Sequence, residues 1–291
     1  MKNTFYRAAI FTATLAFVVI VLGVFVRLSG TGLEMIHRYL AGLLAAAIAV
    51  LAVMALRNRK DYFQPVILPC ILLVLVVVQA LPALWIENMS LTAGLVLLHL
   101  LGGVATFSLL AWLALRSNPR RLYTPPASAR ALKPWISAAI GLLVIQVALG
   151  GWTSANDAAL SCPDFPTCMG QWWPESDFAG GFVYGMGSAA GNEGGGLREA
   201  ARIAIHMAHR VGALVMLFFL AALSIKMMRT PALDLHGKAV LFILLLQISL
   251  GVINVLLQVP LINAVAHSST ASILLFTLVT ALHRAVPRRG M

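Results

Sequence analysis

The sequence is poor in charge, in acidic residues and in cysteine. Only 11% of its 291 residues are charged, whereas a soluble domain carries about 25%, so we exclude a soluble globular protein. The net charge of +11 does not indicate nucleic acid as a partner, because the basic residues cluster in short segments between long apolar runs. A cleavable signal peptide is not expected either, since the first apolar run can span a membrane and no small-residue cleavage site follows it.

Long apolar runs dominate what is present. A membrane-spanning helix needs about 20 apolar residues, and eight runs qualify. They are residues 8–28, 34–56, 66–86, 91–115, 134–154, 201–226, 238–258 and 261–283. The sequence therefore predicts an all-α membrane protein with eight transmembrane helices.

The distribution of Lys and Arg predicts the orientation. Sixteen of the 21 lie in the amino terminus, in the segments after the second, fourth and sixth runs, and in the tail. Cytoplasmic segments carry this excess, so both termini are expected in the cytoplasm, or in the matrix of a mitochondrion. Residues 155–200 then form a long outer loop. Cys162 and Cys168 lie in it, six positions apart, and are disulfide candidates on an oxidising side of the membrane, for either structure or redox chemistry.

The two halves of the chain resemble each other. Gln79 precedes His99 by 20 residues, as Gln247 precedes His267. Further matched segments are Leu22-Gly23 with Leu149-Gly150, and Glu34 to Arg38 with His206 to Arg210. Both halves start on the same side, which predicts two parallel, pseudo-symmetric four-helix bundles. We expect an N-terminal repeat at 1–117, a linker at 118–133 and a C-terminal repeat at 134–291.

Four histidines are expected at one depth, each near the outer end of a helix: His37, His99, His209 and His267. Ionisable or metal-binding side chains are costly in a bilayer and usually functional. Two histidines from facing helices can hold a heme iron from both sides, so we predict one heme site per half. A single membrane histidine could instead make an interhelical hydrogen bond. Four at matched depth and spacing favour heme.

Charged neighbours of these histidines suggest further roles. Arg38 and Arg210 could bind heme propionates, or simply extend to the interface. Glu34 lies three residues before His37, on the same helix face, and could exchange protons with a substrate; alternatively it is an acid favoured at a helix start. The matching residue in the second half is His206. This difference suggests a reactive first half and a permanent cofactor site in the second.

The whole pattern resembles the heme A synthase family. The resemblance covers nearly the whole chain and includes eight spans in two repeats, Glu34-x-x-His37-Arg38, His99, His209-Arg210, His267, and the loop Ser161-Cys162-Pro163-Asp164-Phe165-Pro166-Thr167-Cys168. It implies an enzyme of the bacterial inner membrane that oxidises the C8 methyl group of heme o to the formyl group of heme a for terminal oxidases.

The resemblance also implies residue roles. His209 and His267 would hold heme b, with Arg38, His206 and Arg210 as cofactor-binding neighbours. His37 and His99 would receive heme o, and Glu34 would be catalytic. Expected partners are heme o, membrane lipid, heme o synthase and oxidase assembly factors; a homo-oligomer is compatible with the resemblance.

One segment departs from the family. Members often carry a Cys-Pro-Asp-Trp-Pro-type segment in the first outer loop too, but here that loop is little more than Ser29-Gly30-Thr31-Gly32. This absence argues against cysteine-dependent transfer at the first site. The rival reading is a diheme cytochrome b-type electron carrier, which needs the histidine pairs but has no need of Glu34.

Overall fold

The computed structural model describes residues 2–60, 65–85, 93–118, 123–182 and 197–287. Each predicted apolar run forms a long helix within these ranges. The helices are α1 (Lys2–Ser29), α2 (Glu34–Arg57), α3 (Ile67–Trp85), α4 (Ala93–Arg116), α6 (Lys133–Ala155), α8 (Glu199–Met228), α9 (Asp234–Leu256) and α10 (Leu261–Ala285). Two short helices, α5 (Ala127–Ala131) and α7 (Phe178–Gly181), were not predicted.

The helices form because a chain in lipid must satisfy its backbone hydrogen bonds internally. Among the described residues, seven helices are long and apolar enough to cross a membrane. The apolar part of α3, Ile67–Leu81, is shorter than the others. The protein is therefore an all-helical membrane protein, and large side chains such as Val74, Phe218, Phe242 and Ile262 are exposed on its outer faces, where lipid would cover them.

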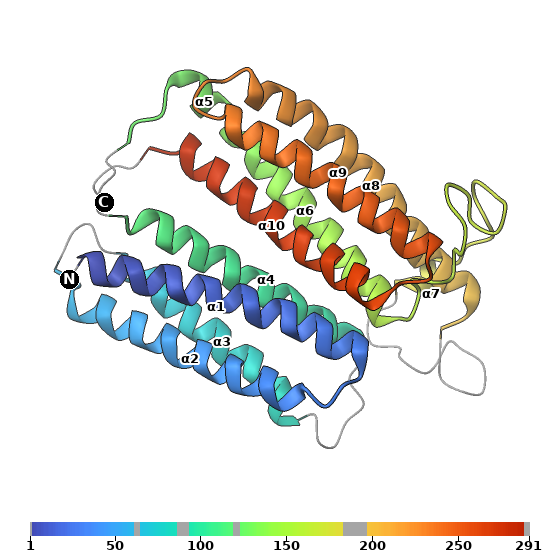
Figure 1. Ribbon diagram of the computed structural model, residues 1–291, viewed down its shortest axis with the longest axis horizontal. Coiled ribbons are helices and arrows are strands. Elements are labelled where there is room, and N and C mark those ends of the chain that lie inside the picture. Colours follow the sequence, from blue (N-terminus) through green and yellow to red (C-terminus); the bar gives the residue numbers. More distant parts are fainter. Residues whose placement is uncertain (1, 61–64, 86–92, 119–122, 183–196, 288–291) are drawn as a thin grey trace.

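The long helices pack in two groups of four (Figure 1). In the first group α1 contacts α2 and α4, while α3 contacts α2 and α4. In the second group α8 contacts α6 and α9, while α10 contacts α6 and α9. Each group surrounds its own apolar core, and fully buried members include Ile48, Leu72 and Leu110 in the first and Leu220 and Leu274 in the second.

The two groups meet along α1, α4, α6 and α10. At the centre of this contact Phe107 of α4 lies between Phe17 of α1 and Phe276 of α10, with ring centroids 5.5 and 5.9 Å away. Aromatic contacts of this length are favourable. The groups therefore form one packed body.

The connections at one end of the bundle differ greatly in length. The start of α1 and the end of α10 lie at the opposite end from the loop after α6 (Figure 1). Between α1 and α2 only residues 30–33 intervene, and Gly30 adopts a positive φ of 59° there, a conformation that favours glycine. The connection from α6 to α8 spans residues 156–198 and contains the disulfide.

Candidate heme-binding sites

The first histidine pair comes together between α2 and α4. The ring centroids of His37 and His99 are 6.5 Å apart, with the ring planes at 73°. Gly23 of α1 lies against His37: a Cβ on this glycine would be 2.8 Å from Cε1 of the imidazole. Only glycine therefore lets α1 approach this ring so closely.

The spacing of this pair suits two bonds to one iron. A metal–imidazole bond is about 2 Å long, and the ring centroid lies roughly 1 Å behind the nitrogen, so two imidazoles on opposite sides of an ion have centroids about 6 Å apart. In the described part of the chain no three His, Cys, Asp or Glu side chains are close enough to hold an ion. Two protein ligands are enough for the iron of a porphyrin, because the porphyrin ring supplies the other nitrogen ligands.

The second pair has the same type of helix neighbours. A Cβ on Gly150 of α6 would be 3.0 Å from Cε1 of His209, and a Cβ on Gly251 of α9 would be 3.2 Å from Cε1 of His267. Gly150 corresponds to Gly23 in the repeat. Three of the four histidines, His37, His209 and His267, thus lie against a glycine of a neighbouring helix.

Hydrogen bonds orient His267. Its Nδ1 lies 3.1 Å from the backbone carbonyl of Gln247 and its Nε2 lies 3.3 Å from the side-chain Nε2 of the same residue. A carbonyl can only accept, so Nδ1 carries the proton and Nε2 offers a lone pair. Metal-binding histidines typically make this bond, so the ring is prepared for iron at Nε2.

Unpaired buried polar atoms gather around the histidines. In the described part of the chain, Oε1 of Gln146 and Oε1 of Gln247 are buried without a hydrogen-bond partner. Unpaired buried polar atoms are rare in native proteins and often mark functional sites. Together with the ring spacing, they indicate that these residues fit a bound heme.

The outer disulfide loop lies on one face of α8. Its sulfurs, in Cys162 and Cys168, are 1.98 Å apart and buried, so the predicted disulfide is confirmed. They pack against Ile203 and Met207, and Nδ1 of His206 lies 3.0 Å from the backbone carbonyl of Ala158. Positions 203, 206, 207 and 210 are spaced as one helix face.

Arg210 fastens this loop. Its guanidinium donates to the backbone carbonyls of Thr167, Cys162 and Asp164 at 2.7, 3.0 and 2.7 Å and lies 5.8 Å from the ring centroid of Phe165. The structure therefore shows Arg210 bound to the loop, while its contact with a propionate stays a prediction. His206 is likewise engaged with the loop.

In the first half, the connection from α1 to α2 consists of residues 30–33 alone, and residues 86–92 lie outside the described part of the chain. Glu34 is the first residue of α2 and is exposed, as is Arg38 one turn later. Both lie in the first two turns of the helix that carries His37. Their proposed catalytic and propionate-binding roles stay predictions.

The acidic residue of the disulfide loop is strongly hydrogen-bonded. The carboxylate of Asp164 accepts from the Thr167 hydroxyl and from the backbone N–H groups of Gly170 and Met169. These bonds, the hydroxyl first, lower the pKa of Asp164 to about 2. Asp164 thus stays ionised and holds the turn that follows it.

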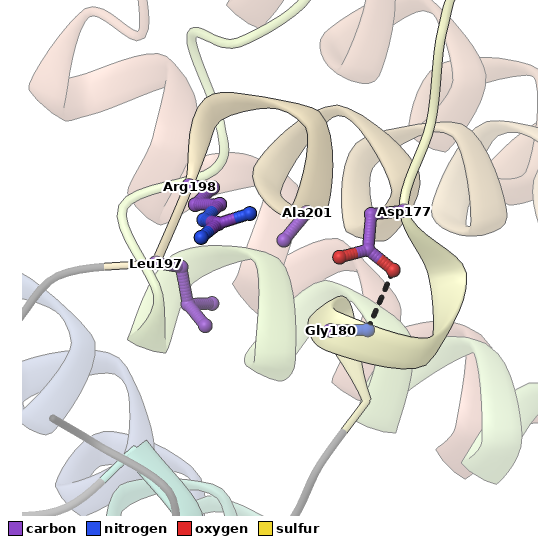
Figure 2. A pocket seen from close by; sticks show the side chains of 5 residues that line it. All are labelled: Asp177, Gly180, Leu197, Arg198 and Ala201. Carbon is purple, nitrogen blue, oxygen red and sulfur yellow. Dashed lines mark hydrogen bonds between the residues drawn. The ribbon is translucent and has the colours of Figure 1, made fainter. Parts of the chain in front are cut away.

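A cavity of about 230 Å³ lies beside the start of α8 (Figure 2). It is lined by Asp177, Gly180, Leu197, Arg198 and Ala201. The Asp177 carboxylate accepts from the backbone N–H of Gly180 at 2.8 Å, which caps the short helix α7. None of the four predicted ligands lines this cavity, so it belongs to loop packing.

Sequence reasoning missed Gln146. Its amide Nε2 lies 3.0 Å from Nδ1 of His209 and 2.9 Å from the backbone carbonyl of His209. A glutamine in an apolar helix, one turn before the repeat glycine Gly150, was the signal that could have revealed it.

Comparison with known proteins identifies relatives over most of the chain. Residues 32–279, which include both histidine pairs, match the COX15-CtaA family, described as cytochrome oxidase assembly protein. A heme A synthase from Shewanella oneidensis is 37% identical over 248 residues, covering 85% of this chain and 74% of the relative. A heme A synthase from Caulobacter vibrioides is 27% identical over 256 residues, covering 83% of this chain and 69% of the relative.

Proposed function

The chain belongs to the COX15-CtaA family of cytochrome oxidase assembly proteins, and from this premise we propose that it is a heme A synthase. It is an oxidoreductase that converts the C8 methyl group of heme o to the formyl group of heme a. The observation that carries the proposal is the pair His37 and His99, whose 6.5 Å ring separation suits a heme iron, in a chain 37% identical to a named heme A synthase.

The two pairs take different hemes in this proposal. His209 and His267 hold heme b as a resident cofactor, which supplies one-electron redox chemistry when bound. His37 and His99 hold the substrate heme o, with Arg38 available to a propionate. The disulfide loop that packs on α8, the helix of His209, supports this division, because a resident cofactor does not have to leave.

Glu34 acts on the substrate. Oxidation of the methyl carbon to an alcohol and then an aldehyde passes two electrons per step to an external oxidant and releases protons, and a carboxylate can accept these protons. Glu34 shares a face of α2 with His37 and is exposed, so it is free to face a heme held there. His206, its counterpart, is buried and bonded to the loop and cannot serve in the same way.

The proposed architecture has eight spans in two pseudo-symmetric repeats, 1–117 and 134–291, joined by the linker 118–133. Both termini lie in the cytoplasm and the disulfide loop faces outward across the bacterial inner membrane. The matched helix contacts of the two groups support this arrangement. Heme o synthase, which supplies the substrate, and oxidase assembly factors, which receive the product, are the partners that such a reaction requires.

Heme extraction tests the function. The chain is expressed in cells that make heme o but lack their own heme A synthase, and extracted hemes are separated by chromatography. Heme a in the extract is expected, and His37→Ala should abolish it while heme b remains. Heme b alone, with no heme a from the unmodified chain, would instead identify a diheme electron carrier.

A further inference from the structure

The disulfide loop exposes several large apolar side chains, although it does not span the membrane. Phe165, Met169, Trp172, Trp173 and Phe178 are 46, 57, 75, 61 and 38% exposed, and together they are called the apolar patch here. Trp173 and Phe178 stack with ring centroids 5.8 Å apart, yet both remain exposed. Large exposed apolar patches usually mark an interaction surface, so a partner other than water is expected to cover this one.

The loop lies on a side of α8 that faces lipid. Its cysteines pack against Ile203 and Met207, and Arg210 binds its backbone carbonyls. The stripe of α8 that these positions form continues to Leu214 and Phe218, which are 55 and 70% exposed. In a membrane, lipid covers the exposed part of this stripe, and the loop occupies the part of the same stripe nearest the start of α8.

The contacts of the loop also extend well beyond the first turn of α8. Glu199 and Arg202 form an exposed ion pair at 2.9 Å in that turn, which places the turn at the level of water or headgroups because charge is costly in hydrocarbon. Arg210 is eight residues further along the helix, or about 12 Å at the rise of an α-helix. The loop therefore lies beside the apolar part of α8, at the depth of the headgroups and the adjoining acyl chains.

The backbone of the loop is hydrogen-bonded in the way that contact with lipid requires. Irregular backbone is tolerated at membrane depth only where its polar groups find partners away from lipid. Arg210 donates to three carbonyls of the loop, and Cys168 and Gln171 bond to each other through both N–H groups at 2.8 and 3.1 Å. The carboxylate of Asp164 accepts from two further backbone N–H groups. A loop surrounded by water could leave these groups to the solvent.

The charge of the loop is compensated as well. Asp164 is the only charged residue between Asp157 and Glu175, and its carboxylate interacts electrostatically with the guanidinium of Arg210. No Lys or Arg lies between residues 156 and 182, so the loop itself offers no basic side chain to a phosphate. These residues fit the uncharged boundary between headgroups and acyl chains better than an anionic headgroup.

We propose that the disulfide loop is an interfacial element whose apolar patch binds phospholipid in the membrane leaflet at this end of the bundle. Tryptophan suits this position, because its ring is apolar while its N–H needs a polar partner that the headgroup region supplies. Met169 is exposed on a turn that it forms with Gly170, both with positive φ, and its flexible thioether adapts to irregular apolar surfaces. The inference goes beyond the proposed function and involves no heme.

Fluorescence quenching in lipid nanodiscs tests the proposal. The unmodified protein and the double variant Trp172→Phe/Trp173→Phe are placed in phosphatidylcholine discs whose acyl chains carry bromine near the headgroup, near the methyl end, or not at all. The difference in emission between the two proteins reports the two tryptophans. Bromine near the headgroup should quench most of this emission, bromine near the methyl end should quench less of it, and aqueous iodide should quench little.

Trp152→Phe is the matched control. The Trp152 side chain is only 8% exposed, and its Nε1 donates to the backbone carbonyl of Gly181 at 2.8 Å. The emission that Trp152 contributes should therefore respond little to bromine at either depth or to iodide. A strong response of Trp172 and Trp173 to bromine, with a weak response of Trp152, assigns the quenching to the apolar patch.

Two results would overturn the proposal. Quenching of Trp172 and Trp173 by iodide but not by bromine would show that the patch lies in water, open to a soluble partner protein. Resistance to both quenchers would show that protein covers it, as in an oligomer of this chain.

A second measurement needs no variant and decides the question if the double variant does not fold. The fold leaves Met169 more than half exposed, so folding alone does not shield it from hydroxyl radicals in water. Oxidation of Met169 in the disc should be much slower than in the denatured chain, and an equal rate would overturn the proposal. Neither measurement depends on heme, so a chain that makes no heme a would refute the proposed function and leave this inference standing.

Discussion

At the scale of single residues, the two halves differ most clearly at Glu34 and at the neighbours of the histidines. The histidines repeat in both halves, but the carboxylate three residues before His37 has the imidazole of His206 as its counterpart. Glycines opposite the rings repeat as well, at Gly23 and Gly150. We therefore expect the residues that match in both halves to bind heme, and the unmatched ones to give the two halves different chemistry.

Glu34→Gln should keep heme b and greatly reduce heme a. Removing one acid–base group typically lowers a rate by about 10²–10⁴-fold, and the amide keeps the size of the side chain. Heme a formed per heme b is the measurement. The control is Glu199→Gln, which removes the acid from the first turn of α8. Equal activity loss in both variants would show that Glu34 only favours the start of its helix.

Gly150→Ala should displace His209 and lose heme b. The new Cβ would lie 3.0 Å from Cε1 of the imidazole, and overpacking of this kind costs roughly 1–3 kcal/mol. Gly141→Ala in the same helix is the control, because nothing lies within 4 Å of its Cβ position. It should retain heme and gain stability by up to about 1 kcal/mol from helix propensity. Heme content, measured by absorbance, is compared between the two variants. Full heme content in Gly150→Ala would show that Gly150 does not pack closely against His209.

At the scale of elements, hydrophobic length predicted the helices well. Runs of about 20 apolar residues leave a chain in lipid little choice but the helix, and the disulfide followed from two nearby cysteines in one loop. The docking of that loop on α8 was not predicted. Arg210 is 43 residues beyond Thr167, whose carbonyl it binds, and such a distant contact depends on the folded shape of the loop rather than on any local pattern.

Arg210→Lys should loosen the disulfide loop. A lysine ammonium cannot reach three carbonyls with a planar fork, and each hydrogen bond to a charged group contributes about 1.5–3 kcal/mol. The rate at which a thiol reagent reduces Cys162–Cys168 should rise about tenfold or more. Arg202→Lys is the control on the same helix, because Arg202 only pairs with Glu199 at 2.9 Å. Equal reduction rates in Arg210→Lys and the unmodified protein would show that Arg210 does not hold the disulfide loop in place.

The disulfide loop should lose its folded structure at low pH. The hydrogen bonds to Asp164 lower its pKa from 3.8 to about 2, so ionised Asp164 stabilises the folded loop. This contribution is complete above about pH 4 and is lost as the pH falls through 2. The protection of the Met169 and Gly170 amides against hydrogen exchange, taken relative to the intrinsic rate at each pH, should fall over that range. Asp164→Asn should remove the pH dependence, and a persistent dependence in that variant would assign it to another group.

At the scale of the whole molecule, the charge distribution predicts which end faces the cytoplasm. Two cysteine variants in a Cys70→Ala background test this orientation. Thr31→Cys lies in the short outer link and Leu235→Cys lies at the start of α9, both exposed. A membrane-impermeant maleimide should label the first in intact cells and the second only after the membrane is opened. The reverse pattern would invert the topology.

The repeat itself was predictable at this scale, because glutamine, glycine and histidine recur at fixed spacing. What the repeat could not predict were its asymmetries in space, such as the Gln146 contact and the covered face of α8. Those depend on which side chains meet across helices, and one sequence carries no direct record of such contacts.

The unequal outer connections also set an order of assembly during synthesis. Domains form from the amino terminus as the chain emerges, and α1 and α2, joined by residues 30–33, can insert as a hairpin with nothing to export. In the proposed orientation, residues 156–198 must first cross the membrane and meet an oxidant. Only when α8 has followed can Arg210 bind the loop carbonyls. In that orientation, we expect the second half to mature late and to depend on the export and thiol-oxidation machinery of the cell.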